Sequence, residues 1–295
     1  MDYEKFKEEL VNEVERQAGE EYQVSLQKVK KNNGISKNAV SISRKGRKVA
    51  PVIYIDSFYE KYQQGVSIVH LAASMLQHFQ DLEESMLPVN MDFYSEYENV
   101  RENIYCKLIN IGMNREILRE IPYRTYLDLA VVYYYLMDMS DDGNATILIN
   151  QKQLELWDLT GEELDRQAWE NTVADLPASL RPMSEILHEY LDAPETEIKS
   201  PPLPMYVLTN EKKIFGAICI RYPGILKKLA EKLGGDFYIL PSSVHECILV
   251  PVAGSASRDV LKEMVIDINL TQVEPQEILA NQVYMYSRAL DQIMF

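Results

Sequence analysis

The sequence predicts an α+β protein, in which stretches rich in strands and stretches rich in helices follow one another along the chain. Two observations lead to this class. Short apolar runs bounded by turn residues occur in pairs, as in antiparallel hairpins. Longer segments carry apolar residues every three or four positions, as amphipathic helices do. We expect an N-terminal helix–antiparallel sheet–helix unit packed on a larger α+β portion with two β-hairpins and C-terminal helices.

The helix–sheet–helix unit is expected to span residues 1–86. Apolar residues at helical spacing predict a helix over residues 2–17. Strands are expected at 22–29, 40–43 and 49–55, with a turn at 32–34 and a hairpin tip at 44–48. A second helix should cross residues 58–80 despite the glycine at position 65.

A hairpin and helical portion is expected over residues 93–191. Four apolar residues spaced by four, four and three predict a helix over 97–111. The run 125–139 is rich in β-favouring residues and can turn at 141–144 into 145–150, so we interpret it as a hairpin. A helix over 125–137 is the alternative. Residues 151–191 should be mostly helical, with a capping box from Thr160 to Glu163 and a helix that opens after Pro182.

The last portion is expected over residues 205–295, after a connector at 192–204 that contains four prolines. Its elements are predicted in the following order: strands at 205–208 and 214–220, a helix over 223–233, strands at 237–240 and 247–250, and helices near 257–270 and over 275–293.

Composition excludes several classes of protein. The formal net charge of −15 argues against a protein that coats nucleic acid. No window approaches 18 uninterrupted apolar residues, and the charged, amphipathic start does not resemble a signal peptide. The cysteines Cys106, Cys219 and Cys247 are too far apart for a paired-cysteine zinc motif and too few for a disulfide scaffold. We therefore expect a cytoplasmic protein without membrane contact.

No metal site and no cofactor are expected. His70 and His78 are eight residues apart, which separates them by about 12 Å along a helix and prevents joint ligation of one ion. Acidic residues crowd the turn at 138–144, but the later bidentate glutamate of a calcium loop is missing. The glycines lack the spacing of the known phosphate-binding loops.

The segment between the strands at 237–240 and 247–250 is the strongest candidate for chemistry. It contains Ser242, Ser243, His245 and Glu246. A serine could act as nucleophile, His245 as its base and Glu246 as the group that orients the base. However, neighbouring strand residues point to opposite faces, and no nucleophile-elbow motif is present. The structural interpretation, in which these polar groups close a turn, is therefore favoured.

A second candidate is a basic hairpin on an acidic chain. Residues 22–55 contain eight basic residues and no acidic one. The hairpin could bind phosphate, nucleic acid or an acidic partner, but no aromatic residue for base stacking lies between positions 28 and 48. A solvated edge is the favoured interpretation. The candidate binding residues are Lys28, Lys30, Lys31, Arg44, Lys45, Arg47 and Lys48.

Five motifs, taken together and in order, resemble a known family. They are Lys30-Lys-Asn-Asn-Gly34, Pro51-Val-Ile-Tyr-Ile-Asp-Ser-Phe-Tyr59, Ala168-Trp-Glu-Asn-Thr172, Leu240-Pro-Ser-Ser-Val-His-Glu246 and Val283-Tyr-Met-Tyr286. The chain thereby resembles a bacterial family known as domain of unknown function 5688, over almost its whole length. The resemblance implies a bacterial, cytoplasmic protein and brings no activity, ligand or catalytic residue with it.

The sequence favours a non-enzymatic protein that acts through a protein-binding surface, with an unknown protein as partner. Nineteen tyrosines suit half-buried surfaces, because each ring combines an apolar body with a polar tip. The first alternative is a hydrolase or transferase that uses the serine, histidine and glutamate cluster at 242–246. The second alternative is nucleic-acid or phosphate binding through the basic hairpin at 28–48.

Overall fold

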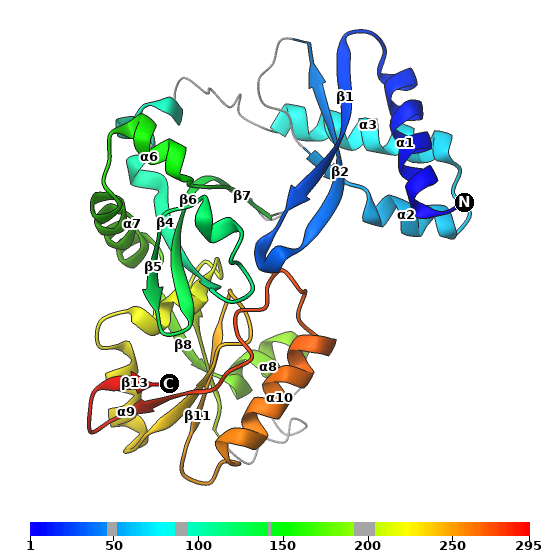
Figure 1. The fold of residues 1–295 in the computed structure, drawn as a ribbon. Helices are drawn as coiled ribbons and strands as arrows, with labels where there is room; N and C mark the ends of the chain where they lie inside the picture. The colour runs from blue at the N-terminus through cyan, green and yellow to red at the C-terminus, as the bar shows by residue number, and fades with distance from the viewer. Residues whose placement is uncertain (46–51, 86–93, 141–142, 192–203) are drawn as a thin grey trace. The chain divides into compact units, whose positions relative to one another are not determined.

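The computed structural model describes residues 1–45, 52–85, 94–140, 143–191 and 204–295, and it has the expected α+β architecture (Figure 1). The chain divides into two compact units, Met1–Glu96 and Tyr97–Phe295. Residues 46–48 of the predicted hairpin tip, 141–142 of the predicted turn and 192–203 of the connector lie outside the described residues.

The first unit is a three-stranded antiparallel sheet with helices before and after it. Its elements are α1 (Tyr3–Ala18), β1 (Tyr22–Lys30), β2 (Ser36–Arg44), β3 (Val52–Tyr54), α2 (Asp56–Gln63) and α3 (Ile68–Ser85), and the strand order is β1–β2–β3. The predicted turn at 32–34 is a short 3-10 helix, η1 (Asn32–Gly34). The expectation of one helix over 58–80 is wrong. The helical conformation is interrupted between α2 and α3 at Gly65, which has a φ of 97°.

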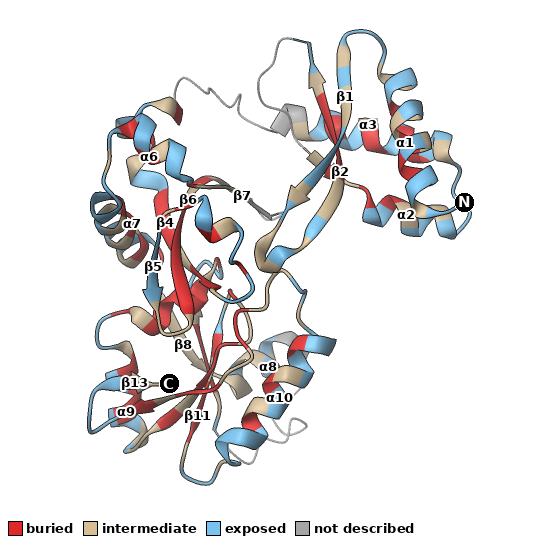
Figure 2. Ribbon diagram, in the orientation of Figure 1, coloured by how far each residue is buried: buried red, intermediate tan, exposed pale blue. Residues whose placement is uncertain are grey.

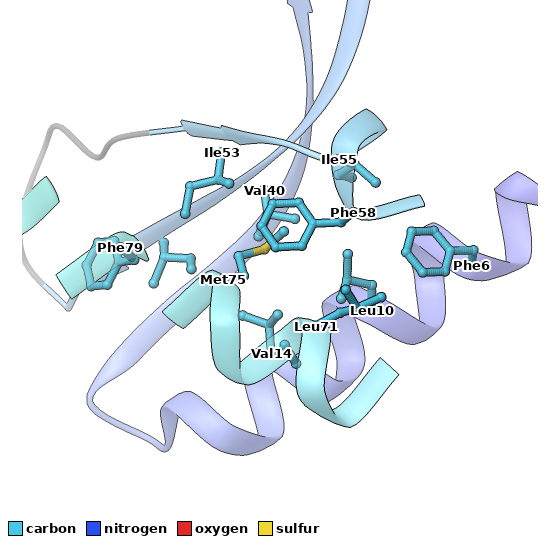
Figure 3. Packing of buried hydrophobic residues seen from close by; sticks show 12 residues of the cluster. Phe6, Leu10, Val14, Val40, Ile53, Ile55, Phe58, Leu71, Met75 and Phe79 are labelled. Carbon is cyan, nitrogen blue, oxygen red and sulfur yellow. The ribbon is translucent and has the colours of Figure 1, made fainter. Parts of the chain in front are cut away.

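The core of the first unit lies between the helices and one face of the sheet (Figure 3). In the antiparallel register Val24 lies opposite Ile42, and Leu26 lies opposite Val40. Because strand side chains alternate between faces, these four residues share one face. On it Val24, Val40 and Ile42 pack in the core, whereas Leu26 is 42% exposed. The fully buried side chains come mainly from α1, β2 and α3, and include Phe6, Leu10, Val14, Val40, Ile42 and Met75.

The second unit contains two antiparallel sheets. The smaller sheet has β6 (Leu129–Ser140) at its centre, paired with β4 (Ile104–Asn110), β5 (Tyr123–Tyr126) and β7 (Gly143–Leu148). Figure 2 shows buried residues concentrated in β4 and β6. Around this sheet lie α5 (Tyr97–Val100), η2 (Arg101–Asn103), η3 (Ile117–Arg119), α6 (Gln151–Trp157) and α7 (Gly161–Asp175). The capping box from Thr160 to Glu163 opens α7 as predicted.

The larger sheet has six strands in the order β13–β12–β10–β11–β9–β8. These strands are β8 (Ala178–Pro182), β9 (Tyr206–Asn210), β10 (Phe237–Leu240), β11 (Cys247–Pro251), β12 (Tyr284–Ser287) and β13 (Gln292–Met294). The accompanying helices are α8 (Met183–Leu191), η4 (Gly216–Arg221), α9 (Ile225–Leu233) and α10 (Arg258–Thr271). Because β8 pairs with β9, residues on both sides of the proline-rich stretch build one sheet.

Several predicted elements of the second unit are confirmed and three are wrong. The hairpins formed by β6 with β7 and by β10 with β11 are confirmed, as are α8, α9 and α10. The helix expected over 97–111 is mainly strand β4, and the helix expected over 275–293 contains β12 and β13. The strand expected over 214–220 is the 3-10 helix η4, so β9 pairs with β8 and β11 instead. Strand β8 was not predicted.

Candidate functional site

The segment at 241–246 connects β10 to β11 and is bonded through its backbone to two remote segments. The amides of Leu279 and Ala280 donate to the carbonyls of Ser242 and Pro241, each at 3.0 Å. The amide of Val244 donates to the carbonyl of Glu277 at 2.8 Å, and that of Ala217 donates to the carbonyl of Val244 at 3.2 Å. The connection between the strands is therefore an internal part of the second unit.

His245 is held on several sides by groups from these segments. Its carbonyl accepts the hydroxyl of Thr209 at 2.7 Å, and its Nδ1 accepts the amide of Phe215 at 3.4 Å. The imidazole stacks on the Phe215 ring, with 5.4 Å between centroids and 15° between planes. Its Nε2 lies 3.9 Å from a carboxylate oxygen of Glu277, and one third of the side chain is exposed. The ring is therefore oriented by a backbone amide, an aromatic face and a carboxylate.

Ser243 serves the local turn. Its hydroxyl oxygen accepts the backbone amide of His245 at 3.1 Å, a common serine turn contact. Among the described residues, the imidazole makes no hydrogen bond to Ser242 or Ser243, so the structure does not assemble the predicted nucleophile and base. Ser242 is half-buried.

The glutamate beside the imidazole is Glu277 and not Glu246. Glu246 is exposed and lines a cavity of about 340 Å³ together with Thr209, Arg181 and Glu189. Within that cavity Arg181 and Glu189 already form a two-point ion pair, with N···O distances of 2.9 and 2.5 Å. Glu277 could not be found from the sequence, because it lies 32 positions from His245 in a segment that was expected to be helical and is a turn.

The basic hairpin is formed by β1 and β2, and its described cations partly cover aromatic rings. Lys31 Nζ lies 4.6 Å from the centroid of the Tyr54 ring, and the guanidinium of Arg44 lies 5.8 Å from that of Tyr22. Both tyrosines lie outside positions 28–48, the range in which the sequence has no aromatic residue. The structure places Lys28 and Lys30 on β1 and Lys45 after β2, whereas Arg47 and Lys48 lie outside the described residues.

The three cysteines are buried and free. Burial raises the pKa of the Cys106 thiol to about 11 and that of Cys219 to about 12. Burial also raises the pKa of Cys247. Because the thiolate is the reactive form, these side chains behave as small apolar groups at neutral pH.

The described residues offer neither a metal cluster nor a membrane-spanning helix. No group of three or more histidine, cysteine, aspartate or glutamate side chains is positioned to hold a metal ion in this part of the chain. None of the described helices combines the length and apolarity needed to cross a bilayer.

Helix α10 carries more apolar surface than the sheet beneath it covers. Leu261 and Val265 are buried against β10 and β11. Beside them, one helical turn apart, lie Val260, Met264 and Ile268, whose exposed fractions are 45%, 51% and 43%. We call these three residues the α10 stripe. Figure 2 shows exposed residues along this helix.

The comparisons with known proteins identify a family. The model of a family described as "Family of unknown function (DUF5688)" matches residues 3–288 of the chain, which confirms the resemblance seen in the sequence motifs. No curated protein and no solved structure gives a significant match. The function is therefore inferred from the arrangement of the residues themselves.

Proposed function

We propose that this chain, which belongs to the family of unknown function DUF5688, is a non-enzymatic bacterial protein of the cytoplasm that acts through a protein-binding surface on α10. The observation that carries the proposal is the α10 stripe. Exposed apolar residues are common when scattered singly, but three large ones aligned on one helix form a continuous apolar ridge.

The geometry of α10 indicates what the partner should look like. The stripe borders the buried face, so a partner that covers it would extend the apolar contact that the helix already makes with the sheet. Such a ridge fits an apolar groove or helix face on another protein. We therefore expect a protein partner with an apolar surface rimmed by polar groups.

The two alternative functions have weaker support. A hydrolase or transferase at 242–246 would need the imidazole to reach a serine hydroxyl. Instead, Nδ1 of His245 accepts the backbone amide of Phe215, and the Ser243 hydroxyl accepts the backbone amide of His245. Nucleic-acid binding at the hairpin would need rings for base stacking, yet no aromatic residue lies between positions 28 and 48.

The proposal is tested by changing the stripe in the full chain. Met264→Asp places a charge at the centre of the stripe, and Leu270→Asp places the same charge on the same helix, at a residue that is 79% exposed and outside the stripe. We expect a specific partner, recovered from cells that contain the protein, to be lost with Met264→Asp and retained with Leu270→Asp. Equal recovery with the two variants, or measurable turnover of a small substrate without any partner, would contradict the proposal.

A further inference from the structure

A second cavity of the second unit lies where several elements meet. Its volume is about 390 Å³. Strand β5 contributes Tyr126, the end of η4 contributes Arg221, α9 contributes Lys227, and the β12–β13 region contributes Tyr286, Asp291 and Gln292. We call this space the Arg221 cavity. It shares no residue with the cavity beside Glu246 and none with the α10 stripe.

Arg221 is held between aromatic rings. Its guanidinium carbon lies 4.6 Å from the centroid of the Trp169 ring and 5.3 Å from that of Tyr126. Trp169 in turn meets the edge of Tyr222 at 5.7 Å and 89°. The hydroxyl of Tyr222 bonds to the carbonyls of Thr172 and Leu176, both at 2.8 Å, which fixes this ring to the end of α7. The guanidinium is therefore positioned before any ligand arrives.

The guanidinium has no acceptor of its own in the described part of the chain. Its Nη1 is buried without a hydrogen-bond partner, and no described carboxylate forms an ion pair with it. Asp165, one turn before Trp169, is occupied by Arg124 at 3.0 Å and Tyr133 at 2.8 Å. Asp291 is occupied by Lys227 at 3.5 Å and by Tyr286. Arg221 is thus a half-buried cation that has no counter-ion among the described residues.

An oxyanion would complete this arrangement. Aromatic faces attract a cation but offer no lone pair in the plane of the guanidinium, where its N–H groups point. A carboxylate or phosphate group supplies both the missing charge and paired acceptors that match the arginine fork. Tyr126, which also lines the cavity beside Arg221, carries a phenol that can serve as a further hydrogen-bond donor.

The rest of the cavity indicates the body of the ligand. A volume of about 390 Å³ is in the range of sites for organic molecules and exceeds what an inorganic ion fills. The cavity is also lined by apolar and aromatic side chains, which include Leu226, Tyr286 and Ile293. We propose that the Arg221 cavity binds a small organic oxyanion, with its carboxylate or phosphate group on Arg221 and its apolar body against these side chains.

Four probes test the proposal by calorimetric titration of the full chain. Benzoate and phenyl phosphate combine an oxyanion with an apolar ring, inorganic phosphate has no ring, and benzyl alcohol has no charge. We expect benzoate, phenyl phosphate or both to bind more tightly than inorganic phosphate and benzyl alcohol. The ratio of the affinities for benzoate and phenyl phosphate should identify the preferred acid group. Absence of saturable binding, or binding of inorganic phosphate or benzyl alcohol at equal or higher affinity, would overturn the proposal.

Variants assign the binding to Arg221. Arg221→Gln should weaken binding of the better probe about tenfold or more, because a two-point charge-assisted contact is lost. Arg221→Lys keeps the charge without the fork and should bind less well than the wild type. Arg119→Gln removes the same charge from an exposed residue that does not line the cavity, and it should leave the affinity unchanged. Equal effects of Arg221→Gln and Arg119→Gln would contradict the assignment.

The stability of the variants distinguishes a ligand site from a structural arginine. Removing a half-buried cation that has no counter-ion among the described residues relieves an unfavourable charge. Without probe, Arg221→Gln should therefore melt at the same temperature as the wild type or higher. A clearly lower melting temperature would show that the contacts with Trp169 and Tyr126 exist to hold the fold, and the proposal would fail.

Discussion

The polar side chains around His245 hold two segments against the β10–β11 connection. Thr209 reaches the carbonyl of His245, and Ser243 accepts its amide. The sequence indicates the serine and histidine cluster but not these contacts. Thr209, Phe215 and Glu277 come from segments that only the folded sheet brings together, and no local spacing indicates them.

Gly216 lies where these segments pack closely together. A Cβ at this position would lie 2.2 Å from Thr209 Oγ1, 2.6 Å from the His245 carbonyl oxygen and 2.7 Å from the Asn210 amide nitrogen. Two of these neighbours are backbone atoms that cannot move alone. We expect Gly216→Ala to lower the free energy of unfolding by about 1–3 kcal/mol or more, measured by urea denaturation.

Gly161 is the matched control. It is the first residue of α7, and a Cβ there meets nothing within 4 Å. Because alanine favours the helix, Gly161→Ala should leave stability unchanged or raise it by up to about 1 kcal/mol. If Gly216→Ala were no more harmful than Gly161→Ala, the close approach of Thr209 and His245 would be wrong.

At the scale of elements, the sequence predicted helices with clear ends and failed where apolar runs are ambiguous. Helix α7 was found because its capping box has a local signature. In β4, residues four apart lie on one side of a strand as well as of a helix, and nearly every β4 residue is buried, so alternation is lost. The run at 214–220 is also apolar throughout, and a buried strand cannot be told from a buried helix there.

The two faces of α10 provide a prediction for this element. Leu261 is 6% exposed and packs in the core cluster beneath the helix, whereas Leu270 is 79% exposed. Leu261→Ala should therefore cost about 2–5 kcal/mol of the free energy of unfolding. Leu270→Ala, the same chemical change, should alter it by no more than about 0.5 kcal/mol. Similar losses for the two variants in urea denaturation would mean that α10 is rotated from the orientation described here.

For the whole molecule, each of the two units has a core that the sequence indicated through its apolar spacing. The sequence could also indicate the abundance of tyrosine, but not which rings become buried. Tyr105 and Tyr126 lie in different strands of the smaller sheet, and burial raises the pKa of each to about 12. That burial depends on helices and strands far away in the sequence.

These tyrosines predict a loss of stability at high pH. A raised pKa means that the folded protein favours the neutral phenol, so the unfolded chain ionises first, near pH 10. The contribution is fully present below pH 10 and is lost as the pH rises from about 10 to 12. Urea denaturation should therefore show a steep decline over this range. Tyr126→Phe should lose less stability than the wild type across it, and an equal decline would contradict the role of Tyr126.

The central claim is that the protein acts by binding a partner protein at the α10 stripe. The most direct test places a photoreactive amino acid at position 264 or at position 270 of the full chain, in cells that contain the protein. We predict a specific crosslinked partner from position 264, and none from position 270, although both side chains are exposed. Crosslinks of equal yield from both positions, or none from position 264, would contradict the claim.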